Sequence, residues 1–441
     1  MTARTIVGAA LALGLGLGLL AGCTPSEVIL PGERLDIRDG RPGAAAQMVN
    51  EARAVPLPVA VANADWTHRN GGPDHAMSHP ALPGTLTLAF AADIGEGDSR
   101  GARITADPVV AGGRIYTLDA RANVTATSLG GATLWTRDVT PASDGRADAS
   151  GGGIAVADGR VFVATGFGRL TALDAATGAE LWTQVLQAPG GSAPTVLGDL
   201  VYVVARDSRA WALDVGSGRI AWQIAGIPST ANFAGGAGAA VTSDIAVFPF
   251  PSGEVLAAFP QGGLRRWSSV IAGARPGQAG GVAATDISGD PVIDGGTVYV
   301  GNVSGRVVAM RLADGERLWT ALDGATSPVW PAGGSLFLIN DINQLVRLDA
   351  ADGSPVWRVD LPVFVAANAR RQSTRHAHYG PVLAGGRLIV ASSDGVIRQF
   401  DPTSGAPLGD IALPGGAASN PVVAGGTLFV VTKRGQLAAF R

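Results

Sequence analysis

The stretch ALDAATGAELW, residues 172–182, contains the pattern A-x-D-x-x-T-G-x-x-x-W, and this pattern decides the fold. The Asp174 side chain can accept backbone N–H bonds, and Gly178 can take a left-handed conformation, so the chain reverses its direction here. The strand that follows carries Trp182. The stretch therefore predicts a tight turn between two antiparallel strands, with a tryptophan on the second strand.

The same unit recurs along most of the chain, beginning with PVVAGGRIYTLDA at residues 108–120. One apolar position of the second strand marks its eight copies: Tyr116, Phe162, Tyr202, Phe248, Tyr299, Phe337, Ile389 and Phe429. Neighbouring markers are 38 to 52 residues apart. Short segments such as AGG and ADG between alternating runs predict two-residue hairpins, because primed turns need positive φ. A period in the forties with four short strands per copy is typical of a β-propeller.

A tryptophan marks the fourth strand in six copies, always 19 or 20 residues after the marker of its own copy. These residues are Trp135, Trp182, Trp222, Trp267, Trp319 and Trp357. A tryptophan on the outer strand can fill the wedge between neighbouring blades, and its indole N–H can reach a carbonyl of the next blade. The repeated tryptophan thus predicts a structural contact and implies no cofactor by itself.

The two ends of the repeat indicate how the ring closes. The eighth copy ends at Arg441, before its fourth strand, and GTLTLAFAADIG at residues 84–95 predicts an isolated strand with Phe90 at the tryptophan position. We expect this strand to complete the C-terminal blade, which removes two exposed sheet edges. The prediction is an all-β, eight-bladed propeller of four-stranded antiparallel blades. Leu408 replaces tryptophan in the seventh blade, where we expect a looser interface.

The N-terminal region resembles a bacterial lipoprotein signal. Arg4 precedes an apolar run at residues 6–22, and LAGC at residues 20–23 resembles a lipobox around Cys23, the single cysteine. We expect a signal peptide over residues 1–22 and acylation of Cys23, with an uncleaved transmembrane anchor as the alternative; both export the chain. Thr24 in place of aspartate indicates the outer membrane. Residues 23–82 show no strand or helix period and predict a lipidated, extended tether, and residues 83–441 form the propeller.

Composition and the histidines offer little sign of other chemistry. The net charge is −3, and no basic stripe indicates nucleic-acid binding. His75 and His79 have the spacing of two zinc ligands on a helix, but their segment is rich in helix breakers, so an ordinary loop is the alternative. His376 and His378 lie in the basic stretch 369–380, interpreted either as a solvated loop or as a contact for an acidic partner.

The repeats resemble those of propeller dehydrogenases that use pyrroloquinoline quinone. Such enzymes place a vicinal cysteine pair against the quinone and bind a calcium ion with carboxylate and amide ligands. Cys23 is the only cysteine here, so the pair cannot form. Most carboxylates, such as Asp174, fall in turns where they have a local structural role. The sequence therefore predicts no enzyme, no cofactor and no bound metal.

The lipobox, the tether and the eight-bladed propeller together resemble the BamB family, lipoprotein accessories of the BAM complex, which inserts β-barrels into the bacterial outer membrane. The segment WTHRNGGPDHAMSHPAL at residues 66–82 resembles the alphaproteobacterial branch. The resemblance implies a scaffold anchored by its lipid to the periplasmic face of the outer membrane. The implied partners are the POTRA domains of BamA, other BAM components and nascent barrel proteins, whose strands exposed sheet edges could accept.

The resemblance also implies contact residues on two long, glycine-rich loops, residues 226–239 and 272–290, although flexible linkage is the alternative for both. The implied residues are Asn232, Phe233, Ala234, Asp286 and Ser288. The first loop lacks the arginine of the family, and serine replaces a second acid at position 288. A different function, binding of a small ligand or saccharide in the central funnel, needs polar and aromatic groups near the axis. The first strands carry mainly Ala, Val, Gly and Pro, which argues against it.

Overall fold

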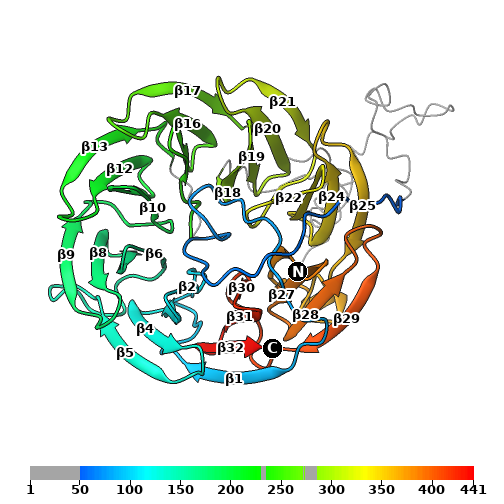
Figure 1. Cartoon of the computed structure of the whole chain (residues 1–441), viewed down its shortest axis with the longest axis horizontal. Coiled ribbons are helices and arrows are strands. Elements are labelled where there is room, and N and C mark those ends of the chain that lie inside the picture. Colours follow the sequence, from blue (N-terminus) through cyan, green and yellow to red (C-terminus); the bar gives the residue numbers. More distant parts are fainter. Residues whose placement is uncertain (1–49, 230–234, 272, 274–285) are drawn as a thin grey trace, which may run out of the picture. The chain divides into compact units, whose positions relative to one another are not determined.

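The computed structural model describes residues 50–229, 235–271, 273 and 286–441. Its strands form eight separate four-stranded antiparallel sheets, which are arranged as blades around one axis (Figure 1). The first strand of each blade lies nearest the axis, and the fourth lies at the rim. The only helical element within the described residues is the short 3-10 helix η1 (Ala369–Arg371). The predicted eight-bladed all-β propeller is confirmed.

Seven blades are continuous in sequence. Blade 1 contains β2 (Val109–Ala111), β3 (Arg114–Leu118), β4 (Asn123–Ser128) and β5 (Thr133–Asp138), and blade 2 contains β6 (Gly152–Ala157), β7 (Arg160–Thr165), β8 (Arg169–Asp174) and β9 (Glu180–Val185). Blade 3 contains β10 (Thr195–Leu197), β11 (Leu200–Val204), β12 (Arg209–Asp214) and β13 (Ile220–Ala225), and blade 4 contains β14 (Ala240–Val241), β15 (Ala246–Pro249), β16 (Glu254–Ala258) and β17 (Arg265–Val270). Blade 5 contains β18 (Ile287–Asp294), β19 (Thr297–Asn302), β20 (Arg306–Arg311) and β21 (Arg317–Ala321), and blade 6 contains β22 (Trp330–Ala332), β23 (Ser335–Ile339), β24 (Gln344–Asp349) and β25 (Pro355–Asp360). Blade 7 contains β26 (His378–Ala384), β27 (Arg387–Ser392), β28 (Val396–Phe400) and β29 (Pro407–Ala412).

Blade 8 is built from both ends of the propeller sequence. β30 (Val422–Ala424), β31 (Thr427–Thr432) and β32 (Gln436–Phe440) form its inner part, and β1 (Leu88–Asp93) is the outer strand. β1 pairs antiparallel with β32, with Ala91 opposite Ala438. The predicted closure of the ring by the N-terminal strand is therefore confirmed.

The six repeated tryptophans join neighbouring blades as predicted. Each indole Nε1–H donates to a main-chain carbonyl of the next blade at 2.9 to 3.3 Å, the acceptors being Ala175, Val215, Pro260, Leu312, Ala350 and Pro402. Most of each ring is removed from water, which favours the contact by the hydrophobic effect as well.

The turn that precedes the outer strand explains why glycine follows threonine in the opening motif. Asp174 Oδ1 accepts from Thr177 N at 2.8 Å and from Thr177 Oγ1 at 2.7 Å, and Gly178 has a φ of 72°. A Cβ on Gly178 would lie 2.6 Å from Cε3 of Trp135 in the preceding blade. Glycine is thus required both by the backbone and by the indole that packs on it.

Two blades depart from tryptophan at this position. Phe90 on β1 takes the tryptophan position of blade 8, and a Cβ on Gly131 of blade 1 would lie 2.8 Å from its ring. In blade 7 the expectation of Leu408 at this position is wrong. Gly409 pairs with Gln399 as Trp182 pairs with Ala172, and Leu408 is the exposed residue at the adjoining register shift. Blade 7 therefore has no side chain at the tryptophan position.

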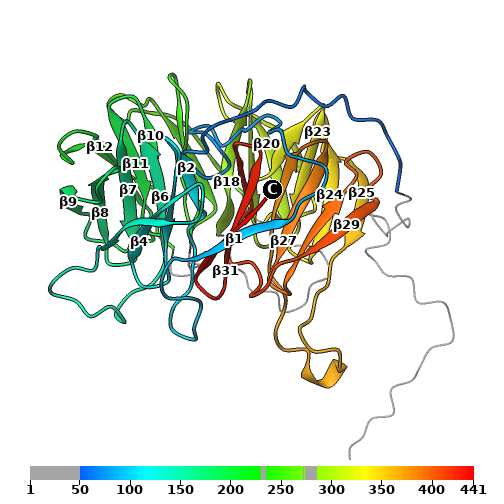
Figure 2. The same ribbon diagram turned by 60° about the horizontal axis from the view of Figure 1, so that its bottom comes forward.

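Residues 50–82, which we call the strap, differ from the extended tether expected for them. The strap lies on one face of the ring and winds around its centre (Figures 1 and 2). Hydrogen bonds join it to the inner strands or hairpins of seven blades through the pairs Trp66–Val110, Thr67–Val156, His68–Val196, Pro73–Val241, Asp74–Ile293, Pro80–Gly385 and Asn63–Gly425. In blade 6, Trp330 stacks on Trp66 with ring centroids 6.2 Å apart. The strap contacts each blade through a few residues before it moves on to another, so no strand period develops in its sequence.

The strap defines two distinct faces of the propeller. Its partners include the hairpins between first and second strands, such as Gly112 and Gly425. Because successive strands of a blade alternate in direction, the hairpins between second and third strands and the connections between blades lie on the opposite face, here called the open face.

Candidate functional site

The predicted partner loops connect consecutive blades and therefore emerge on the open face. Residues 226–239 run from β13 to β14, and residues 272–290 run from β17 into β18. Cys23 and the predicted contact residues Asn232, Phe233 and Ala234 lie outside the described residues. The parts of both loops that are described meet at one small pocket.

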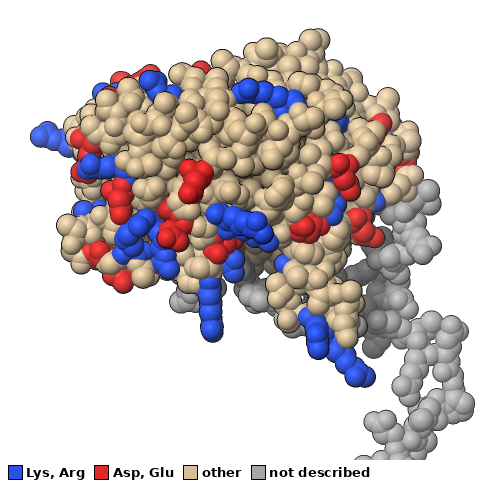
Figure 3. Space-filling view, turned by 90° about the horizontal axis from the view of Figure 1, so that it is seen from below, with Lys and Arg blue, Asp and Glu red and all other residues tan. Residues whose placement is uncertain are grey.

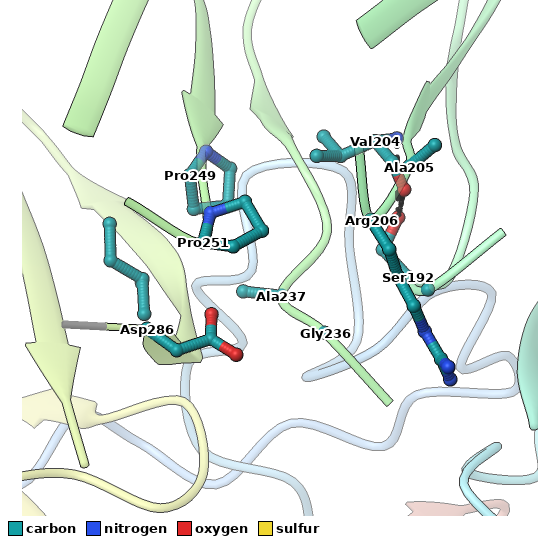
Figure 4. A pocket seen from close by; sticks show the side chains of 11 residues that line it. Ser192, Val204, Ala205, Arg206, Gly236, Ala237, Pro249, Pro251 and Asp286 are labelled. Carbon is teal, nitrogen blue, oxygen red and sulfur yellow. Dashed lines mark hydrogen bonds between the residues drawn. The ribbon is translucent and has the colours of Figure 1, made fainter. Parts of the chain in front are cut away.

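Asp286 lines this pocket and is only 3% exposed. Arg206, which follows β11 on the open face, lines the same pocket, and Figure 4 shows the two side chains on opposite sides of Gly236 and Ala237. Burial lowers the pKa of Arg206, and the charge of Asp286 opposes that effect. Ser288 donates from Oγ to the carbonyl of Ala325 at 2.5 Å. The prediction that Asp286 and Ser288 contact a partner stays a prediction.

Arg206 is a residue that sequence reasoning missed. The first loop lacks an arginine, but the neighbouring hairpin of blade 3 brings Arg206 to the base of both loops. A basic and an acidic side chain therefore share one pocket on the open face. No local sequence signal pointed to this, because Arg206 and Asp286 are 80 residues apart.

His75 and His79 are structural residues of the strap. His75 Nδ1 lies 2.9 Å from the carbonyl oxygen of Pro291, and both histidines are buried. His79 contacts the carbonyl of Pro58 through Nδ1 and accepts from the Gly386 amide through Nε2 at 2.8 Å. Within the described residues, no group of three histidine, cysteine or acidic side chains is placed to hold a metal ion.

The basic stretch 369–380 belongs to a loop that projects from the open face (Figure 2). Lys and Arg side chains gather at the end of this projection (Figure 3), where Arg370 and Arg371 are exposed. His378, by contrast, is buried: Nε2 donates to the Pro362 carbonyl at 2.8 Å, and burial lowers its pKa. The stretch thus has an exposed basic tip, whereas His378 at its other end is buried and packs in the blade.

The centre of the ring is polar, which the composition of the first strands did not predict. Arg69 of the strap is bound to Asp107 at 3.1 Å and to Asp290 at 3.3 Å. Burial alone would lower the pKa of Arg69, but Asp290 and Asp107 raise it above its ordinary value. Asp107 also accepts from the Asn420 amide nitrogen of blade 8 at 2.8 Å, and Asp290 from Gly238 of blade 4 at 2.7 Å. One guanidinium therefore links the strap to blades on several sides of the axis.

Beyond Arg69, a cavity of about 700 Å³ extends toward the open face. Its polar lining comes from the connections between blades and from hairpins, including Asp98, Arg103, Arg375 and Lys433. The described part of the chain contains no helix with the length and apolar character that crossing a bilayer requires.

These features define the class of protein: an eight-bladed propeller whose blades dock through the tryptophans of quinone-enzyme-type repeats. The sequence matches the model of the family described as outer membrane protein assembly factor BamB over residues 120–359 and 343–441, and the chain belongs to that family.

Individual relatives agree with this assignment. The outer membrane protein assembly factor BamB of Shewanella oneidensis is 24% identical over 287 residues, which cover 65% of this chain and 70% of the relative. The protein of the same name in Moranella endobia is 22% identical over 317 residues, covering 70% of this chain and 78% of the relative.

Solved structures share the fold. BamB from Moraxella catarrhalis superposes with a TM-score of 0.66 at 18% identity, covering 81% of this chain and 100% of that one. A quinohemoprotein alcohol dehydrogenase from Comamonas testosteroni gives a TM-score of 0.66 at 15% identity, covering 86% of this chain and 81% of that one. Similar folds therefore occur in an assembly factor and in an oxidoreductase, so the fold alone does not separate the two functions.

Proposed function

We propose that this chain is a non-catalytic scaffold of the outer-membrane β-barrel assembly machinery, and that it binds the POTRA domains of BamA. The observation that carries the proposal is the family match over most of the propeller, together with relatives named as outer membrane assembly factors. Its mechanism is positioning: a rigid ring presents loops that hold POTRA domains in a productive arrangement.

The BamA contact is proposed on the open face of blades 3 to 5. The loops 226–239 and 272–290 join neighbouring blades, and their described ends share the pocket that contains Arg206 and Asp286. An aromatic anchor beside charged side chains is the composition expected of an interface hot spot. Phe233 supplies the anchor in this proposal, while Arg206 and Asp286 support the loops from below and supply charge.

The absence of enzymatic activity is also part of the proposal. Cys23 is the only cysteine of the chain, so a vicinal cysteine pair cannot face a quinone. Asp174 and Asp214 are held in turns by hydrogen bonds from residues that follow them. These hydrogen bonds lower the pKa of both carboxyl groups, which suits a structural anion better than a base.

The proposal places the protein on the periplasmic face of the outer membrane, anchored by acyl chains on Cys23 after removal of residues 1–22. Each buried methylene of such a chain contributes about 0.8 kcal/mol, so several chains hold the protein firmly. Mass determination of the mature N-terminus tests the anchor: an unmodified Cys23 or an uncleaved residue 1 would contradict it.

Direct contact with nascent barrel strands is a second proposed role. Asn50 and Glu51 run along the outer strand of blade 6, where Glu51 N donates to the Val356 carbonyl at 3.0 Å. Asn50 also exchanges side-chain hydrogen bonds with the backbone of Arg358. The outer strand of blade 6 therefore hydrogen-bonds to a segment of its own chain through free edge groups, and a client strand would use such edge groups more fully in β-augmentation.

The BamA contact is tested by titrating the full chain, purified in mild detergent, with the soluble POTRA domains of BamA. We expect Phe233→Asp to weaken binding by more than tenfold, because an aromatic hot spot contributes about 2 kcal/mol or more. Phe259→Asp is the matched control: Phe259 is 44% exposed on the same blade 4, in a turn on the strap face.

Two outcomes would overturn the assignment. If Phe233→Asp and Phe259→Asp bind POTRA domains equally well, Phe233 is not the anchor and the assignment of the contact to its loop is wrong. If the unmodified chain neither binds these domains nor co-purifies with BamA from membranes, the proposed function itself is wrong.

A further inference from the structure

The axial cavity is formed by residues from many parts of the ring. Thr105 and Asp107 of blade 1, Ser288 of blade 5 and Asn420 of blade 8 line it, so it must surround the axis. Arg69 of the strap lies at one end. The remaining lining comes from open-face elements, including the loop after β25 and the hairpins that follow β27 and β31. The described lining of the cavity thus reaches the open face.

The carboxylates of the cavity are already neutralised. Asp98 pairs with Arg103 at 3.2 Å, Asp107 pairs with Arg69, and Asp394 pairs with Arg398 at 2.6 Å.

Two cations of the lining lack such a partner. Within the described residues, Arg375 and Lys433 belong to no ion pair. Lys433 Nζ donates to the Ser393 carbonyl at 2.6 Å, which uses one of its three hydrogens, and the Arg375 guanidinium lies 5.8 Å from the Phe364 ring centroid. The cavity therefore has uncompensated positive charge and spare N–H donors.

Tyr379 adds a neutral donor. It lines the cavity from β26, and its hydroxyl makes no hydrogen bond to another described residue. Burial, followed by the charges of Asp98 and Asp107, raises its pKa, so the hydroxyl keeps its proton at neutral pH. The side chain is only partly buried, so its hydroxyl can donate to a ligand that enters the cavity.

The rest of the lining combines hydroxyl groups with apolar side chains such as Ile104 and Val365. Hydroxyl groups line the cavity at Thr105, Thr326, Ser327, Thr374 and Ser393. A volume of about 700 Å³ lies in the range of pockets that hold small molecules.

We propose that the axial cavity binds a small hydroxylated organic anion, whose carboxylate or phosphate group is held by Arg375, Lys433 and Tyr379. The sugar-like hydroxyls of such a ligand pair with the serine and threonine side chains of the wall. This site is separate from the proposed BamA contact, and its test does not depend on BamA.

Calorimetric titration of the full chain with glucuronate and with glucose 6-phosphate tests the proposal, with glucose as the neutral probe. We expect saturable binding of at least one anion with a Kd below about 1 mM, and glucose binding at least about tenfold weaker. Tyr379→Phe and Lys433→Gln should each weaken the anion by about tenfold, because each removes a hydrogen bond to a charged group.

Arg434→Gln is the matched control for Lys433→Gln. Arg434 is the exposed neighbour in the same hairpin and does not line the cavity, so it removes the same charge without removing a ligand contact. The proposal is overturned if neither anion binds, if glucose binds as tightly as the anions, or if Arg434→Gln is as damaging as Lys433→Gln. A short peptide with a free carboxylate, titrated beside its amidated form, overturns the hydroxylated class if it binds and the sugars do not.

Discussion

The glycine of the repeat motif offers a direct test of how the blades are joined, through the pair Gly178→Ala and Gly159→Ala. Both glycines lie in blade 2 with nearly equal backbone angles, φ of 72° and 70°. A Cβ on Gly178 would approach Trp135 Cε3 to 2.6 Å, whereas nothing lies within 4 Å of a Cβ on Gly159. The left-handed backbone costs about 1–2 kcal/mol for alanine at either site.

The additional cost at Gly178 comes from the indole. Carbon atoms at van der Waals contact are about 3.5–4.0 Å apart, so the ring must move by roughly 1 Å. Overpacking of this kind costs about 1–3 kcal/mol, and the movement also strains the Trp135 Nε1 hydrogen bond to the Ala175 carbonyl, which is 3.2 Å long. Gly178→Ala should therefore destabilise by about 2–5 kcal/mol, against about 1–2 kcal/mol for Gly159→Ala.

Urea unfolding of the full chain, followed by tryptophan fluorescence, measures both free energies of unfolding. A double-mutant cycle isolates the contact: in a Trp135→Ala background, the two glycine substitutions should cost the same. Equal losses in the unmodified background would refute the reasoning, because the indole would then play no part in the requirement for glycine.

Three further changes probe the strap. Arg69→Met should lower the free energy of unfolding by about 3–5 kcal/mol, because it leaves Asp107 and Asp290 buried without a counter-charge; a loss below about 1 kcal/mol in urea would contradict this. Trp66→Ala should cost about 3–5 kcal/mol in the same assay, because Trp66 is buried against the propeller, and an unchanged midpoint would show that the strap is dispensable. Burial, with a smaller contribution from His75, lowers the pKa of His68 from 6.5 to about 3. Between these two pH values His68 is protonated in the unfolded chain and neutral in the folded chain. Stability should therefore be full above pH 6.5 and fall as the pH drops toward 3, and His68→Gln should flatten this fall in a pH series of urea midpoints.

The parts of the fold that could be predicted from the sequence are those set by local interactions that recur in each copy of the repeat. The Asp174 turn and the tryptophan at a constant offset depend on residues within one copy and on its immediate neighbour. Closure by β1 was predictable for the same reason, since the eighth copy of the repeat lacks its fourth strand and the strand predicted at residues 84–95 belongs to no other copy. Phe90 takes the expected position over Gly131.

The strap and the polar axis could not be predicted in this way. The strap contacts each of the eight blades through only a few residues, so its sequence has no period to detect. Arg69 and Asp290 are 221 residues apart, and neither stands in a recognisable motif. The argument from apolar first strands failed to anticipate the axis because Arg69 comes from the strap and Asp107 from the connection before β2, while Asp290 is a single acidic residue within β18, the first strand of blade 5.

The strap also limits where a partner or ligand can bind. It is hydrogen-bonded to the inner elements of seven blades on one face, and Trp66 stacks on Trp330 of the remaining blade, blade 6. A partner on that face would have to displace a segment held by the buried Arg69 network, which is costly because two carboxylates would lose their counter-charge. Among the described residues, the open face holds connections between blades, the basic projection and part of the lining of the axial cavity. Binding by this propeller is therefore directed to the open face and the rim, whatever the identity of the partner.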